Sequence, residues 1–334
     1  MKLLVTGGAG FIGSNFIQFM LGKYQDVSIV NLDALTYAGN PDNLEPVKGD
    51  PRHIFIHGDI RDQKRVDALF AEHGFDAVAH FAAESHVDNS IETPNVFVET
   101  NINGTVALLN AARKAWSVGD DVYREGVRFL QVSTDEVYGS LGETGYFTED
   151  TPLDPHSPYS ASKAAADLLV KAYADTYKLP VLVTRCSNNY GPYQNTEKLI
   201  PLMIRNALNG IPLPVYGDGM QVRDWLYVED HCKAIGLVLR EGVPGEVYNI
   251  GGSNEKFNLD VVKLIVRHVG AEESLIRHVT DRKGHDRRYA IDAGKIKAQL
   301  GWTPETPFET GIVKTIDWYV GNRDWVERCK SGKV

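Results

Sequence analysis

The sequence predicts an α/β fold, a doubly wound parallel sheet with a smaller mixed α/β domain at the C-terminal end. Three observations predict it: short apolar runs alternate with helix-length segments, a glycine-rich turn follows the first run, and the composition changes after residue 185. The length of 334 residues corresponds to about two domains. We therefore divide the chain into residues 1–185, with 224–255 rejoining them, and residues 186–334.

The first half alternates between two kinds of segment. The apolar runs predicted as strands are Leu3–Thr6, Ser28–Asp33, His53–His57, Ala77–Phe81, Arg128–Ser133 and Val181–Arg185. The segments between them predicted as helices are Gly13–Leu21, Asp62–His73, Val96–Lys114 and Pro158–Tyr177. Strands separated by helices of this length form βαβ units, whose right-handed crossovers place helices on both faces of one parallel sheet.

The second half has a different texture. Between residues 186 and 222 it is rich in Asn, Gly, Pro and Tyr, which indicates loops around one helix near Leu199–Asn209. Trp225–Val228 and Val247–Ile250 are strand-like and are predicted to return to the first sheet. Leu259–Val269 and Phe308–Val320 are predicted as helices of the smaller domain.

The composition argues against several classes of protein. The 35 basic and 44 acidic residues give a net charge of −9, which disfavours nucleic-acid binding because that requires a basic face. No apolar run reaches about 18 residues, so we expect no membrane span and a cytoplasmic protein. Cys186, Cys232 and Cys329 are widely spaced and form no Cys-x-x-Cys pair, so we expect reduced thiols and no metal site.

The glycine-rich turn is Gly7-x-x-Gly10-x-x-Gly13, between the first predicted strand and the first predicted helix. Glycines there let the backbone approach a pyrophosphate, and the helix N-terminus offers it free N–H groups. Asp33 ends the second strand, where a carboxylate can accept hydrogen bonds from both adenosine ribose hydroxyls. Strand, glycines, helix and acid in this order predict a Rossmann-type dinucleotide site.

Asp33 also selects the dinucleotide. Its carboxylate would repel a 2′-phosphate, and the following Ala34-Leu35-Thr36 contains no arginine to bind one, so NAD is favoured over NADP. Asp59-Ile60 ends the third strand and is expected to face the adenine. Phe81-Ala82-Ala83 ends the fourth strand with small residues that leave room for a ligand.

A second pattern, Tyr159-x-x-x-Lys163, begins a predicted helix, with Ser157 as its N-cap and Pro158 in its first position. The i, i+4 spacing places both side chains on one helix face. Tyrosine has a pKa of about 10, and a lysine ammonium one turn away would lower it, as a tyrosyl base requires. The pair also occurs on ordinary surface helices, but together with the glycine turn it indicates a catalytic pair.

Several motifs carry a resemblance to known proteins. TGGAGFIGSN, Tyr159-x-x-x-Lys163 and STDEVYG (133–139) resemble the extended short-chain dehydrogenase/reductase superfamily. Within it the chain resembles the dTDP-glucose 4,6-dehydratase family at LDALTYAGN (32–40), HFAAESHVD (80–88), SPYSASKA (157–164), RCSNNYGPYQ (185–194), EKLIP (197–201), YGDG (216–219) and KGHDRRYAID (283–292). These motifs span nearly the whole chain.

The resemblance implies a hydro-lyase that converts dTDP-glucose to dTDP-4-keto-6-deoxyglucose and water with tightly bound NAD. It implies that Tyr159, beside Lys163, takes the proton of the sugar 4-hydroxyl and that Thr134 hydrogen-bonds that oxygen. Elimination across C5 and C6 then requires an acid and a base, which two adjacent carboxyl groups in different environments can supply. The family makes Glu136 the base and Asp135 the acid, whereas the residues alone leave that choice open.

The resemblance also implies two sets of binding residues and a homodimer. The expected NAD contacts are Gly7, Gly10, Phe11, Ile12, Gly13, Asp33, Leu35, Thr36, Asp59, Ile60, Phe81, Ala82, Ala83, Thr100, Tyr159, Lys163 and Asn189. The expected nucleotide-sugar contacts are Ser85, Thr134, Asn188, Lys198, Leu199, Pro214, Tyr216, Arg223, Asn258, His285, Arg288 and Tyr289. Arginine forks suit diphosphate oxygens, so a few of them can bind an anion in an acidic chain. The expected dimer interface is Val96–Lys114 with Pro158–Tyr177.

Two alternatives compete with the dehydratase. A sugar-nucleotide 4-epimerase or decarboxylase shares the oxidation at C4 but does not need both Asp135 and Glu136. A non-catalytic NAD-sensing scaffold has no physical need for these two acids together with Thr134, Tyr159 and Lys163. The adjacent acids therefore favour the dehydratase.

Overall fold

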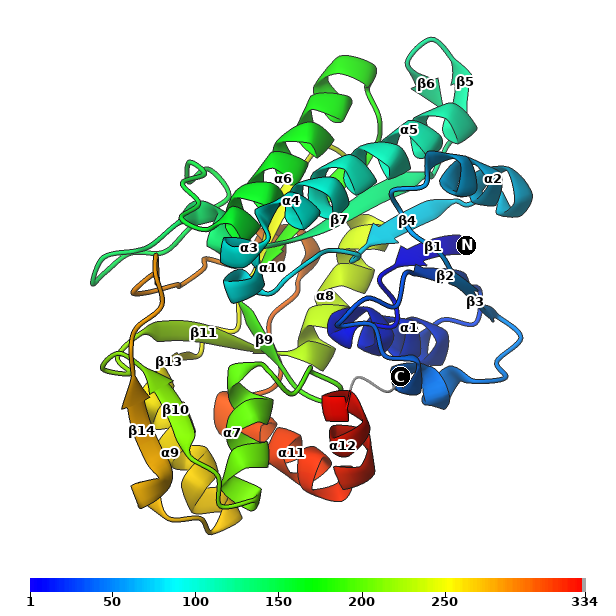
Figure 1. The fold of residues 1–334 in the computed structure, drawn as a ribbon. Coiled ribbons are helices and arrows are strands. Elements are labelled where there is room, and N and C mark those ends of the chain that lie inside the picture. The colour runs from blue at the N-terminus through cyan, green and yellow to red at the C-terminus, as the bar shows by residue number, and fades with distance from the viewer. Residues whose placement is uncertain (332–334) are drawn as a thin grey trace.

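A parallel sheet forms the centre of the computed structural model, which describes residues 1–331; residues 332–334 of the predicted second domain lie outside it (Figure 1). Within the described residues its strand order is β12-β8-β7-β4-β1-β2-β3. The strands are β1 (Lys2–Thr6), β2 (Ser28–Asp33), β3 (His53–His57), β4 (Ala77–His80), β7 (Arg128–Thr134), β8 (Val181–Cys186) and β12 (Val247–Ile250). The chain runs outward from β1 to β3 and then crosses to β4, and doubly wound sheets bind ligands where the order reverses in this way.

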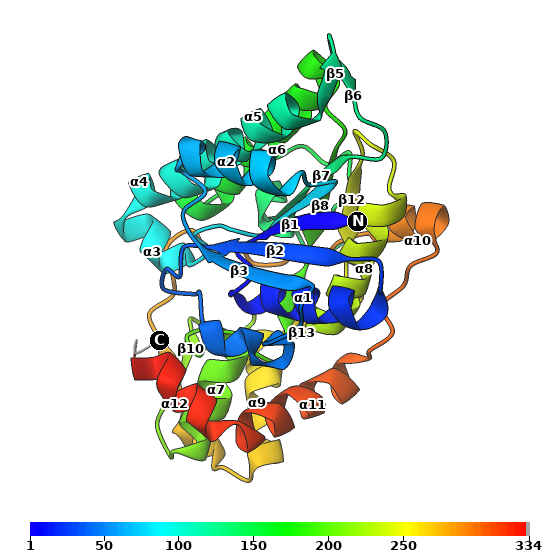
Figure 2. The ribbon, with the colours of Figure 1, turned by 90° about the vertical axis from the view of Figure 1, so that its right-hand side faces the viewer.

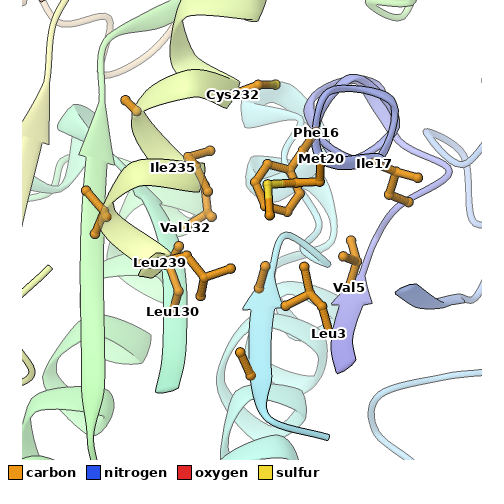
Figure 3. Close-up of a cluster of buried hydrophobic side chains, with 14 of the residues drawn as sticks. Leu3, Val5, Phe16, Ile17, Met20, Leu130, Val132, Cys232, Ile235 and Leu239 are labelled. Carbon is orange, nitrogen blue, oxygen red and sulfur yellow. The ribbon is translucent and has the colours of Figure 1, made fainter. Parts of the chain in front are cut away.

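Helices cover both faces of this sheet (Figure 2), which confirms the predicted fold class. One face carries α1 (Phe11–Lys23), α8 (Val228–Glu241) and α10 (Gly294–Leu300). The other carries α2 (Gln63–His73), α5 (Gly104–Trp116) and α6 (Pro158–Tyr177). Figure 3 shows the first of these interfaces, where Phe16 and Met20 of α1 and Ile235 of α8 meet the apolar side chains of the sheet.

The crossover between β4 and β7 is divided into several short elements. It includes α3 (Val87–Glu92), α4 (Pro94–Phe97), the π-helical turn η2 (Val98–Asn103) that leads into α5, and the hairpin of β5 (Ser117–Gly119) and β6 (Val122–Tyr123). The short 3-10 helices η1 (Pro41–Val47) and η3 (Asp135–Tyr138) follow β2 and β7. No helix of the described residues is long and apolar enough to cross a bilayer. Cys186, Cys232 and Cys329 form no disulfide in this part of the chain.

The second half builds two small sheets against its own helices. β9 (Asn188–Tyr190), β11 (Val222–Tyr227) and β13 (Glu255–Phe257) form one sheet, and β10 (Leu213–Tyr216) pairs with β14 (Ile276–Val279) in the other. The helices are α7 (Leu199–Leu208), α9 (Asn258–Val269), the 3-10 turn η4 (Glu273–Leu275), α11 (Phe308–Gly321) and α12 (Arg323–Ser331). Of the two strands predicted to return to the large sheet, β12 joins it beside β8, but β11 does not. The reason is that Trp225 and Tyr227 of β11 pack into the separate core of the second half.

Candidate active site

A cavity of about 370 Å³ lies at the carboxyl ends of the strands of the large sheet. Its wall includes all five residues predicted to be catalytic: Thr134, Asp135, Glu136, Tyr159 and Lys163. It also includes the predicted NAD contacts Gly7, Gly10, Phe11, Ile12, Gly13, Asp33, Thr36, Asp59, Ile60, Phe81, Ala82, Ala83, Thr100 and Asn189. Leu35 instead lines a neighbouring cavity of about 240 Å³. Segments far apart in sequence meet here because parallel strands end at the same sheet edge.

The glycine turn between β1 and α1 is closely packed. Gly7 has φ of +73°, and a Cβ added to it would lie 2.6 Å from the Ala82 nitrogen. A Cβ on Gly13 would lie 2.3 Å from the Gly7 carbonyl oxygen. The N-cap of α1 is Gly10, which has no side chain that could bond to the helix. The first amides of α1 therefore face the cavity without a side-chain cap. Such a turn fits a dinucleotide pyrophosphate, which needs close backbone approach and free N–H donors.

Asp33 at the end of β2 is held by the same turn. Its Oδ2 accepts a hydrogen bond from Ala9 N at 2.8 Å and its Oδ1 accepts one from Leu35 N at 2.8 Å. Burial raises its pKa, and these two backbone donors oppose the shift and stabilise the carboxylate. Each oxygen keeps lone-pair capacity for a ribose hydroxyl. The glycine turn and Asp33 together therefore fit NAD.

The N-terminus of α6 positions the tyrosine–lysine pair. Ser157 and Ser160 form a capping box, and Pro158 occupies the first helical turn, as the sequence predicts. Tyr159 and Lys163 are both buried, and Lys163 Nζ donates a hydrogen bond to Val132 O of β7 at 2.8 Å. The neighbouring strand thus fixes the ammonium group one helical turn from the phenol.

The electrostatics of this pair differ from the sequence-based expectation. Burial raises the pKa of Tyr159 well above its ordinary value, and the nearby Glu136 raises it further. Burial lowers the pKa of Lys163, and Asp167 on the same helix opposes that shift. The lysine therefore has to compensate both the burial of the phenolate and a neighbouring carboxylate before Tyr159 can act as a base.

The two predicted acids follow β7 in η3. Thr134 caps this turn: its Oγ1 accepts a hydrogen bond from Glu136 N at 3.2 Å and donates one to Asp135 Oδ1 at 3.3 Å. Asp135 is 1% exposed, and its Oδ2 makes no hydrogen bond within the described residues. A buried carboxyl oxygen without a donor favours the protonated acid.

The two acids lie in different electrostatic environments. Burial raises the pKa of Asp135 well above its ordinary value, and the carboxylates of Glu136 and Asp224 raise it further. Burial also raises the pKa of Glu136, but Arg223 and Lys198 oppose that shift. Two carboxyl groups whose environments separate their pKa values can divide the roles of acid and base. The rise is larger for Asp135, although Arg223 opposes it there too, so a proton shared between the two acids favours Asp135 over Glu136.

The predicted nucleotide-sugar residues divide into two groups. Ser85, Thr134, Asn188 and Lys198 line the cavity. Within the described residues, the cavity wall does not include Leu199, Pro214, Tyr216, Arg223, Asn258, His285, Arg288 or Tyr289. All eight belong to the second half of the chain, which lies beside the carboxyl edge of the large sheet (Figure 1).

Part of the second group nevertheless reaches the acid pair. Arg223 is buried, with its Cζ 4.2 Å from the centre of the Tyr289 ring. Arg223 opposes the rise in the pKa of Glu136, and Glu136 in turn raises the pKa of Tyr289 beyond the rise that burial causes. Arg288 is less available to bind an anion, because Glu255 accepts hydrogen bonds from its Nε at 2.7 Å and from its Nη2 at 3.0 Å. Arg223 is thus the predicted arginine placed best to meet an anion beside the acids.

Several residues of the cavity wall were not predicted from the sequence. Those with polar or ionisable side chains include Tyr37, Arg61, Glu84, Cys186, Gln194, Asn195 and Glu197. Tyr37 Oη lies 3.1 Å from Ser85 Oγ, so it lies beside a residue that was predicted to contact the nucleotide sugar. Glu84 and Cys186 each come directly after a predicted strand-end segment, and extending those segments by one residue would have found both.

Comparisons with known proteins show which family the chain resembles over nearly its whole length. A family model described as GDP-mannose 4,6 dehydratase matches residues 4–315. A curated protein from Xanthomonas campestris pv. campestris (strain B100), named dTDP-glucose 4,6-dehydratase, is 58% identical over 338 residues, covering 98% of this chain and 96% of that protein.

Solved structures separate two related activities. DesIV, a dTDP-glucose 4,6-dehydratase from Streptomyces venezuelae with NAD and TYD bound, is 51% identical with a TM-score of 0.92, covering 98% of this chain and 100% of the other. A UDP-glucose 4-epimerase from Thermus thermophilus in complex with NAD is 31% identical with a TM-score of 0.87, covering 96% and 100%. The likeness is thus greater to the dehydratase than to the epimerase.

Proposed function

The chain belongs to the GDP-mannose 4,6-dehydratase family, and from this premise we propose that it converts dTDP-glucose to dTDP-4-keto-6-deoxyglucose and water with bound NAD. The observation that carries the proposal is a pair of adjacent acids, the buried Asp135 and the partly exposed Glu136, in one cavity with Tyr159 and Lys163. In this proposal residues 1–185 hold NAD, and the residues from 186 onward hold most of the nucleotide sugar.

Oxidation at C4 is the first step. Thr134 hydrogen-bonds the sugar 4-oxygen while Tyr159, kept anionic by Lys163, takes the hydroxyl proton. NAD, when bound, accepts the C4 hydride and later returns it to C6. The resulting C4 ketone acidifies the neighbouring C5–H bond, which prepares the elimination.

Loss of water is the step for which the acid pair is needed. Glu136, whose charge Arg223 and Lys198 favour, removes the C5 proton. Asp135, which burial and neighbouring carboxylates keep protonated, gives its proton to the departing C6 hydroxyl. C5 is reprotonated when the hydride reaches C6. The protons balance: the protein takes one from the 4-hydroxyl and one from C5, and it returns one to the leaving water and one to C5.

The competing functions explain the cavity less well. A 4-epimerase or decarboxylase needs the tyrosine–lysine pair but leaves no task for a protonated Asp135 beside Glu136. A non-catalytic NAD-sensing scaffold leaves no task for either acid. Burying ionisable groups costs free energy unless they are paired, and strongly shifted acids in a cavity are characteristic of functional sites, so their presence here supports the dehydratase.

The path of the C4 hydrogen tests the function. dTDP-glucose deuterated at C4 is expected to yield product that carries the deuterium at C6, with no added reduced nicotinamide consumed. Mass spectrometry and NMR of the product locate the label. Deuterium retained at C4 of an epimerised sugar would instead establish the epimerase, and no turnover of any nucleotide sugar would favour the scaffold.

A homodimer through the α5 and α6 region is the second part of this proposal. Three large apolar side chains are exposed there: Leu168 of α6 at 57%, Val98 of η2 at 46% and Ile91 of α3 at 40%. These elements lie side by side on one flank of the molecule (Figure 1). Single exposed apolar residues are common, but three on adjoining helices favour an isologous two-fold contact.

Leu168→Asp is expected to separate the dimer into monomers, because it places a charge in the centre of the proposed apolar contact. Val313→Asp is the matched control: Val313 is 36% exposed on α11, away from this flank, and its substitution should leave the mass unchanged. Light scattering after size-exclusion chromatography measures both. A monomeric unsubstituted protein, or a dimer that survives Leu168→Asp, would contradict this interface.

A further inference from the structure

A buried ion pair lies behind the proposed catalytic pair, between α6 and β8. Arg185 Nε donates to Asp167 Oδ2 at 2.9 Å, and the two side chains are 8% and 1% exposed. Asp167 follows Lys163 by four residues on α6, so both project from the same helix face. β7 and β8 pair with Ser133 opposite Arg185 and with Val132, whose carbonyl accepts from Lys163, opposite the preceding Thr184. Two cations, Arg185 and Lys163, therefore act electrostatically on Asp167.

Arg185 is fixed from a second direction. Its Nη1 donates to Tyr138 Oη at 2.9 Å, and its Cζ lies 4.9 Å from the centre of the Tyr138 ring. Tyr138 Oη in turn donates to Asn249 Oδ1 of β12 at 2.8 Å. A guanidinium held by two partners on different elements has little freedom to move. Asp167 is therefore held by a rigid cation, one helical turn from Lys163.

We propose that Asp167, fixed by Arg185, is a positioning residue that keeps Lys163 charged and aimed at Tyr159. This inference rests on the proposed function, because it explains how the tyrosyl base of that reaction is maintained. A buried ammonium without a counter-charge loses its proton readily, and a neutral lysine cannot stabilise a phenolate. Within the described residues Asp167 is not part of the cavity wall, so its effect on the reaction passes through Lys163.

The other groups that face Lys163 carry no compensating charge. Burial lowers the pKa of Lys163, and Asp167 and then Cys186 of β8 oppose that shift. Burial raises the pKa of the Cys186 thiol, which stays neutral. His80 of β4 also faces Lys163, but burial lowers its pKa to about 3, so it stays neutral as well. Asp167 supplies the counter-charge, and Arg185 keeps it ionised by opposing the rise in its pKa that burial causes.

Asp167→Asn is expected to move the acid limb of the pH–rate profile to higher pH. Without this carboxylate the pKa of Lys163 falls, the phenolate loses its cation, and the pKa of Tyr159 rises. Because Tyr159 works only when deprotonated, the limb should shift upward by about one pH unit, which lowers the rate of C4 oxidation about tenfold at pH 7. The groups facing Tyr159 directly, Glu136, Cys186, Tyr37 and Asp135, are unchanged by the substitution.

Asp175→Asn is the matched control, because it removes an exposed carboxylate from the same helix and should leave the limb in place. A second readout needs no substrate. The tyrosinate absorbance of each protein, minus that of the same protein carrying Tyr159→Phe, gives the titration of Tyr159 alone. That titration should move upward in Asp167→Asn and stay unchanged in Asp175→Asn. An unchanged titration and limb in Asp167→Asn would overturn the proposal.

The double variant Asp167→Asn with Arg185→Met tests whether the shift in Asp167→Asn comes from the lost carboxylate charge or from a disturbed fold. It removes both charges of the ion pair with similar side-chain volumes, so it does not leave the buried Arg185 guanidinium without its partner, which is the main destabilising effect expected of Asp167→Asn alone. We expect it to fold and to keep the upward shift, because Lys163 still lacks its counter-charge. A return to the unsubstituted titration and limb would show a merely structural role. If the unsubstituted protein failed to dehydrate dTDP-glucose, the proposed function would be wrong. The titration of Tyr159 needs no substrate and would still test the role of Asp167.

Discussion

Glu136→Gln is expected to lower kcat for water loss about 100- to 10,000-fold, the usual contribution of a positioned general base. Glutamine keeps the size and hydrogen-bonding shape of the side chain but cannot take the C5 proton. Oxidation at C4 depends on Tyr159 and Lys163, which α6 and β7 hold independently of Glu136. Adding dTDP-glucose should therefore still reduce the bound NAD, seen as nicotinamide absorbance, while dehydrated product fails to accumulate.

Asp135→Asn provides the companion measurement, because the two acids act on different atoms. In deuterated water the C5 proton should exchange in Asp135→Asn, since Glu136 remains to remove it, although water leaves slowly. In Glu136→Gln the C5 proton should not exchange. NMR of recovered sugar measures the exchange. If Glu136→Gln exchanges at the unsubstituted rate and Asp135→Asn does not, the two assignments are reversed.

Much of the first half could be predicted because its signals are local. Pro158–Tyr177 is predicted with the same bounds that the structure gives, since its signals are local: Ser157 directly precedes the segment, and Pro158 and the apolar spacing lie within it. β11 shows the limit. Its apolar residues predict a strand, but whether it joins the large sheet or pairs with β9 depends on the partners of Trp225 and Tyr227. That choice is made by long-range packing, which a strand-like run does not encode.

The residues of the candidate site could likewise be predicted where their signals are local, and not where they depend on long-range contacts. The residues of the glycine turn, the acid pair and the tyrosine–lysine pair each lie at the end of one strand or the start of one helix, and all line the cavity. The basic residues near position 285 could be predicted only as a group. Glu255 binds Arg288, whereas Tyr289 stacks with Arg223, and these pairings bring together residues more than thirty positions apart. Local sequence cannot tell which arginine is already neutralised by a carboxylate.

Gly13→Ala is expected to weaken NAD binding about 10- to 100-fold, because the strain of overpacking is about 1–3 kcal/mol and each 1.4 kcal/mol is tenfold in affinity. The added methyl would lie 2.3 Å from Gly7 O and 2.8 Å from Gly8 Cα, and both are backbone atoms of the turn. Neither can rotate away as a side chain could. The turn must therefore widen or α1 must shift, and either change moves the N–H groups that face the pyrophosphate.

Gly22→Ala on the same helix isolates this effect from helix propensity. Gly22 is exposed near the end of α1, and an added methyl meets no atom within 4 Å. Replacing a helical glycine by alanine there should stabilise the protein by about 0.5–1 kcal/mol and leave NAD affinity unchanged. Calorimetric titration with NAD and thermal unfolding compare the two variants. Equal NAD affinity in Gly13→Ala and Gly22→Ala would mean that the pyrophosphate does not rest on this turn. A loss in Gly13→Ala alone would assign it there, because the two proteins differ only in where on α1 the methyl is added.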